Sequence, residues 1–105
     1  MIRGTTPTYT FKISVDQATV KDIWFTFKQN LKIEEDRSLT KTMKDSVTYD
    51  GTNASLTLTQ EETLMFKEGV AIEIQGKVLT TDNKVSATSI KIEECAKILS
   101  EEVMV

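Results

Sequence analysis

The side chains of this chain that could do acid or base chemistry are carboxylates, because its 105 residues contain no histidine. Catalytic triads, histidine proton shuttles and most zinc sites are therefore excluded. Among the runs of neighbouring carboxylates are Glu34-Glu35-Asp36 and Glu61-Glu62. Neighbouring carboxylates of this kind usually form a solvated surface, and we do not expect them to act as a catalytic pair. We predict that the protein is not an enzyme.

A calcium site is the second chemistry to consider, because Asp45, Asp50 and Asn53 lie close together and carry oxygen ligands. Their spacing matches no calcium-binding loop, and turn formation explains these residues more simply. The four glycines form no phosphate-binding loop and fit turns, a helix stop and one strand distortion. We predict no metal site, no cofactor and no small-molecule substrate.

Cys95 is the only cysteine and cannot close a disulfide within the chain, which fits a reducing compartment. No histidine is available to activate its thiol. We therefore expect it to be a small buried or half-buried apolar side chain.

The charges of the chain are interspersed, and 13 Lys and Arg against 16 Asp and Glu give a net charge of −3. Nucleic-acid binding by phosphate neutralisation is therefore not expected. The first seven residues lack the apolar run of a signal peptide, and no stretch approaches membrane-spanning length. We predict no nucleic-acid or membrane partner and no secretion by a signal peptide.

The elements that position these residues are mostly strands. Val20–Lys28 has Ile23, Phe25 and Phe27 on one face, as in a central strand with a buried side. Asp50-Gly51 predicts a tight hairpin turn, Gln29-Asn30 a second hairpin turn and residues 16–19 a short loop. The predicted strands are residues 8–15, 20–28, 32–44, 46–49, 54–59, 70–79 and 85–92, with 32–44 as an irregular or edge strand.

A short helical turn is predicted between the fifth and sixth of these strands. Thr59 and Glu62 have the spacing of a capping box, so Gln60–Phe66 can form about two turns before Gly69 stops them. We expect Leu64 and Phe66 to plug the end of the core.

The last predicted strand contains a change of parity. Val85 and Ala87 are odd-numbered, whereas Ile90 and Ile92 are even-numbered. A β-bulge near Thr88 and Ser89 would return both pairs to the core face. Beyond Glu94, the spacing of the apolar residues is helical, so we predict that the tail 95–105 is frayed or forms a short helix.

Together these patterns predict one all-β domain over residues 1–105. Its architecture is expected to be an antiparallel immunoglobulin-like β-sandwich of about seven strands, with one short helical turn near residues 60–66.

Trp24 is the exception on the polar face of its strand. One interpretation is that it lies flat on the outside of the sheet or under a loop. The alternative is an anchor for a partner protein, since tryptophan is enriched in binding hot spots. Trp24 is the one candidate contact residue that the sequence offers.

Three segments carry a family resemblance: Met1-Ile2-Arg3-Gly4-Thr5-Thr6-Pro7-Thr8, Leu58–Phe66 and Val78-Leu79-Thr80-Thr81-Asp82. They resemble small proteins encoded in prophage and tail-gene regions of Gram-positive bacteria. The strand, Thr-Gln-Glu-Glu-Thr turn and strand, over about residues 46–93, is also similar to the N-terminal immunoglobulin-like domains of phage upper baseplate proteins. The single domain departs from the baseplate pattern.

The resemblance implies a structural or protein-binding component of a phage or prophage tail or baseplate. Its partners would be other phage structural proteins or further copies of itself, and it would reside in the virion. The alternative hypothesis is an adaptor or assembly factor in the bacterial cytoplasm, which binds its partner through an exposed sheet edge.

Overall fold

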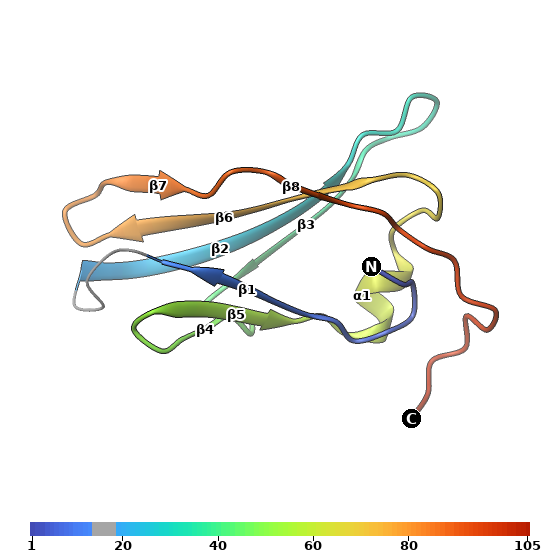
Figure 1. The fold of residues 1–105 in the computed structure, drawn as a ribbon, viewed down its shortest axis with the longest axis horizontal. Coiled ribbons are helices and arrows are strands. Elements are labelled where there is room, and N and C mark those ends of the chain that lie inside the picture. The colour runs from blue at the N-terminus through green and yellow to red at the C-terminus, as the bar shows by residue number, and fades with distance from the viewer. Residues whose placement is uncertain (14–18) are drawn as a thin grey trace.

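The computed structural model describes residues 1–13 and 19–105. The described chain forms two packed antiparallel sheets and one short helix, α1 (Figure 1). Residues 14–18, which hold the predicted end of the first strand and most of the loop after it, lie outside the description. The strands are β1 (Thr8–Lys12), β2 (Val20–Gln29), β3 (Arg37–Thr42), β4 (Thr48–Tyr49), β5 (Asn53–Thr57), β6 (Ile72–Thr80), β7 (Val85–Ala87) and β8 (Lys91–Glu93).

The sheets have the strand orders β1-β5-β4 and β3-β2-β6-β7, and β8 also pairs with β6. Because β7 and β8 follow each other along β6, they act as one interrupted strand, and the described residues form seven strands, which agrees with the prediction of about seven. Three strands face four, as in an immunoglobulin-like sandwich whose larger sheet carries an additional edge strand. The predicted fold class is confirmed.

The core lies between the inner faces of the two sheets. Ile23, Phe25 and Phe27 of β2 are buried, as their alternation predicted, and Ile72 and Ile74 of β6 are buried beside them. The smaller sheet and the segment after α1 complete the core with Tyr9, Ala54, Leu56, Leu58 and Phe66. Edge-to-face ring contacts join the sheets, Tyr9 with Phe27 and Phe11 with Phe25.

Helix α1 (Gln60–Leu64) crosses from one sheet to the other and begins with the predicted capping box. The Glu62 N–H donates to Thr59 Oγ1 at 3.2 Å, and the Thr59 N–H donates to Glu62 Oε1 at 2.9 Å. The helix ends at Leu64, two residues earlier than predicted. Phe66 is completely buried, as expected of a plug, whereas Leu64 is half-buried.

The predicted bulge is present between β7 and β8. Lys77 pairs with Ala87 but Ile74 pairs with Lys91, so three residues lie opposite two. The predicted face is wrong. Val85 pairs with Leu79 and Ile92 with Glu73, and these partners point away from the core. The bulge therefore keeps the apolar residues of this strand on the outer face, where Val85, Ile90 and Ile92 are exposed.

Two further predictions fail at the other end of β2. The Gln29-Asn30 turn is wrong, because Gln29 is the last residue of β2 and is fully buried, and residues 30–36 form the connecting loop. β3 covers only Arg37–Thr42, although it is the predicted edge strand. The Asp50-Gly51 hairpin is confirmed: β4 and β5 pair around it, and Gly51 has a φ of 97°.

The tail 95–105 forms no helix, so that part of the prediction is wrong. Its first residues instead run beside the N-terminal segment, where Ile2 and Ala96 form a parallel bridge. Backbone pairing therefore takes the place of the helix. Among the described residues, no helix is long and apolar enough to cross a membrane.

Candidate functional site

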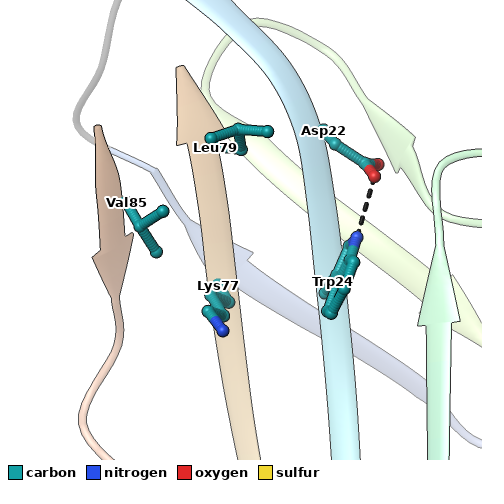
Figure 2. Close-up of a pocket in the computed structure, with 5 residues that line it drawn as sticks. All are labelled: Asp22, Trp24, Lys77, Leu79 and Val85. Carbon is teal, nitrogen blue, oxygen red and sulfur yellow. Dashed lines mark hydrogen bonds between the residues drawn. The ribbon is translucent and has the colours of Figure 1, made fainter. Parts of the chain in front are cut away.

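The candidate site is the outer face, around Trp24, of the larger sheet, which contains β3, β2, β6, β7 and β8. A pocket of about 160 Å³ opens there, and it is lined by Asp22, Trp24, Lys77, Leu79 and Val85. Figure 2 shows these side chains on one face of the sheet, with Asp22 and Trp24 from β2, Lys77 and Leu79 from β6, and Val85 from β7. We call this surface the Trp24 patch.

Strand register brings these residues together. Trp24 pairs with Lys77, Asp22 with Leu79, and Leu79 with Val85, so their side chains share the outer face. The register of β2 on β6 shifts between Val20 and Asp22, which leaves Lys21 as the extra residue of a bulge. Asp22 and Trp24 lie directly after this bulge.

Asp22 fixes the orientation of the indole. The Trp24 indole N–H donates to Asp22 Oδ2 at 2.8 Å (Figure 2), and the other carboxylate oxygen accepts the Ile23 N–H at 2.9 Å. On the other side, Lys77 Nζ lies 5.5 Å from the centre of the Trp24 ring, within the range of a cation–π contact. The tryptophan is thus held between an anion and a cation.

The Trp24 patch is apolar and open to solvent. Trp24 is 43% exposed and Val85 is 56% exposed, and Ile92 of β8 is exposed on the same face of the sheet. An ordered indole beside aliphatic side chains, with one charge of each sign, suits contact with a protein surface.

The outward position of Trp24 is compatible with both interpretations of this residue. Its ring lies on the exterior of the sheet and is 43% exposed. The anchor interpretation remains a prediction. Val85 was predicted to lie in the core and not at this site, although the sequence holds a signal: Trp24 and Leu79 are both apolar exceptions on the outward faces of their strands.

Glu34 and Glu62, two of the carboxylates singled out in the sequence, are engaged in ion pairs. Glu34 binds Lys67 Nζ at 2.8 Å, and this hydrogen bond and charge lower the pKa of Glu34. Glu62 belongs to the capping box and pairs with Lys41 Nζ at 2.7 Å. Glu61 is exposed in the first turn of α1.

Asp45 and Asp50 both serve turns. Asp45 Oδ2 accepts the Thr42 N–H at 2.9 Å, and Asp50 Oδ1 accepts the N–H groups of Thr52 and Asn53 at 2.9 and 2.7 Å. These backbone hydrogen bonds lower the pKa of both carboxyls. Within residues 1–13 and 19–105, no three acidic, histidine or cysteine side chains gather as metal ligands would.

Cys95 is buried, as expected, and burial raises the pKa of its thiol.

Comparisons with protein-family models, with curated proteins and with solved structures gave no match.

Proposed function

We propose that the protein is a structural, protein-binding component of a phage or prophage tail or baseplate, and that the Trp24 patch contacts the neighbouring tail protein. The single observation that carries the binding role is the exposed indole of Trp24, held between Asp22 and Lys77 beside Leu79 and Val85. The tail assignment is supported by the family resemblance of the sequence.

The chemistry of the patch indicates the kind of partner. Tryptophan combines a large apolar surface with little loss of side-chain entropy, which is why it is frequent in binding hot spots. Asp22 and Lys77 at its sides select a partner surface that offers a charge of each sign next to an apolar group. The hydrogen bond from the indole to Asp22 holds this anchor in one orientation before a partner arrives.

Mass spectrometry of purified particles tests the tail assignment. Particles induced from a strain that carries the gene should contain the protein in a fixed ratio to known tail proteins. Its presence in lysed cells together with its absence from particles would refute the structural role.

A gene replacement tests the role of the patch in the same particles. Trp24→Ala should lower incorporation into particles, because it removes the anchor. Ile33→Ala is the matched control, since Ile33 is also an exposed apolar residue but lies in the 30–36 loop. Equal incorporation of both variants would show that the patch is not the contact surface.

The second candidate function is an adaptor or assembly factor in the bacterial cytoplasm. It is favoured by strand β1, an open edge of the smaller sheet, which offers backbone groups for the addition of a strand. Under this proposal the protein binds its partner in infected cells and does not enter the particle, so the particle analysis separates the two functions.

A further inference from the structure

Strand β1 is an open edge of the smaller sheet. The order β1-β5-β4 places β1 at the end, with β5 on one side only. In an immunoglobulin-like sandwich, one more antiparallel strand normally lies on the free side of the strand that corresponds to β1. Within residues 1–13 and 19–105, no segment pairs with the free side of β1.

The backbone groups that face the free side can be identified from the ladder. The Ile13 N–H donates to Thr52 O at 2.8 Å, and the Leu58 N–H donates to Pro7 O at 3.0 Å, so odd-numbered residues bond to β5. Successive residues of a strand point their N–H and C=O groups to opposite sides. Thr8, Thr10 and Lys12 therefore direct theirs to the free side.

The other three edges carry features that hinder strand addition. β4 has only two residues, and the β7–β8 edge is broken by its bulge. β3 has the charged side chain of Lys41 turned inward, where it pairs with Glu62. Short strands, bulges and inward charges are the usual means of blocking an edge. β1 is unbroken over five residues and has no charge before Lys12.

The free edge of β1 is complementary to itself. When two β1 strands run antiparallel about a two-fold axis at Thr10, Thr10 meets Thr10 of the second copy and Thr8 meets Lys12. Each of these even-numbered residues then donates its N–H to the second copy and accepts a hydrogen bond from it with its C=O. Tyr9 lies opposite Phe11 at the intervening positions, where side chains approach most closely.

The space beside β1 suits this arrangement. A groove of about 510 Å³ runs along Pro7–Phe11 and is bounded on the other sheet by Lys91 and Glu93. Phe11 is only half-buried there, although its ring already contacts Phe25. A second β1 strand would cover the exposed part of this ring.

We propose that two copies of this chain pair through their β1 strands, antiparallel and about a two-fold axis at Thr10, to form a continuous six-stranded sheet. Each β1 takes the place of the missing strand in the other copy. The interface does not involve the Trp24 patch, so this proposal stands or falls independently of the proposed tail function.

Light scattering of the purified chain over a dilution series tests the pairing. The wild-type protein should pass from dimer to monomer on dilution. Thr10→Pro should raise the dimer dissociation constant by about tenfold or more, because it removes the N–H on the free side from both copies. Thr10→Val is the matched control: it loses the hydroxyl contact with Ser55 Oγ at 3.1 Å but keeps the backbone N–H.

Charged substitutions at Thr10 test the register of the two β1 strands without a proline variant. Thr10→Lys should weaken dimerisation because two lysines meet at the axis, with Lys12 of the second copy diagonal to each. Thr10→Asp should weaken it less, since the same Lys12 offsets part of the repulsion. An equimolar mixture of the Thr10→Lys and Thr10→Asp variants should dimerise more tightly than either variant does alone. Thr40→Lys, on the exposed face of β3, should leave dimerisation unchanged.

Residue-resolved amide exchange locates the interface. At low concentration the amides of Thr8, Thr10 and Lys12 should exchange fast, while those of Tyr9 and Phe11 are protected by β5. At high concentration only the even-numbered amides should become slower. A wild-type chain that stays monomeric would overturn the proposal, and so would a dimer that Trp24→Ala dissociates while Thr10→Pro and Thr10→Lys do not.

Discussion

The side chain of Gln29 exchanges two hydrogen bonds with the backbone of Lys67. Gln29 Nε2 donates to Lys67 O at 2.8 Å, and the Lys67 N–H donates to Gln29 Oε1 at 2.8 Å. Gln29 Nε2 also donates to Val70 O at 2.9 Å. One buried amide at the end of β2 thus satisfies three backbone groups in the loop that leads from α1 to β6.

Gln29→Leu is therefore expected to lower the free energy of unfolding by about 3 kcal/mol, because the three backbone groups that face this buried side chain lose their partners while the side-chain volume is kept. Chemical denaturation measures this difference. The matched control is Gln60→Leu. Gln60 forms the same pair of hydrogen bonds with Met104, at 2.9 and 2.8 Å, but in solvent. Its loss should cost less than about 1 kcal/mol, and equal costs for both variants would contradict the burial argument.

The bulge between β7 and β8 depends on the hydroxyl of Thr88. Thr88 Oγ1 accepts the N–H of buried Gly76 at 3.0 Å, because the bulge leaves no carbonyl opposite this N–H. Thr88→Val should destabilise the protein by about 2 kcal/mol through the unpaired N–H. Thr88→Ser keeps the hydroxyl and should cost clearly less in thermal unfolding. If serine and valine were equally destabilising, the methyl group of Thr88 would be the important part.

Local sequence signals predicted the local structure well. The Asp50-Gly51 turn and the Thr59–Glu62 capping box each depend on residues within a few positions of one another, and both are present. The bulge near Thr88 was also visible, because a change of parity along one strand requires an additional residue.

The failed predictions concern which surface a residue meets, and that is decided by distant parts of the chain. Gln29 is polar and preceded Asn30, so it resembled a turn residue, but the loop at Lys67 gives it buried partners. Val85 and Ile92 are apolar, so they were assigned to the core, although the register on β6 turns them outward. The helical spacing of the tail was too short to compete with backbone pairing to Ile2.

The capping box makes stability dependent on pH through Glu62. Burial acts to raise the pKa of this carboxyl, but the hydrogen bond and charge of Lys41 and the N–H of Thr59 outweigh it and hold the pKa below its ordinary value of 4.5. A carboxyl with a lowered pKa in the folded state stabilises that state when ionised. This contribution is fully present above pH 4.5 and is lost as the pH falls through the folded-state pKa.

Glu62→Gln should therefore lower the free energy of unfolding by about 1 kcal/mol at neutral pH, and the difference from wild type should shrink towards zero in acid. Denaturant titrations at a series of pH values give this difference, and the other carboxyls are common to both proteins. Glu61→Gln, at the neighbouring exposed position outside the capping box, is the matched control and should cost clearly less at neutral pH. A constant difference for Glu62→Gln would refute the linkage.

The orientation of the proposed binding anchor can be tested through its own fluorescence, because Trp24 is the only tryptophan in the chain. Asp22→Ala removes the acceptor of the indole N–H, which lies 2.8 Å away. The released ring should sample more solvent, so its emission should shift to longer wavelength and its quenching by acrylamide should increase. Asp22→Asn keeps one acceptor oxygen for the indole N–H, although its NH2 group then faces the Ile23 N–H, so it should change both measurements less than Asp22→Ala does. Unchanged quenching in Asp22→Ala would mean that the ring is held by Lys77 and the neighbouring strands alone.

The same pair of variants separates the effect of a fixed indole orientation on partner binding from the effect of the Asp22 charge. If the fixed orientation matters, the alanine variant binds more weakly than the asparagine variant does.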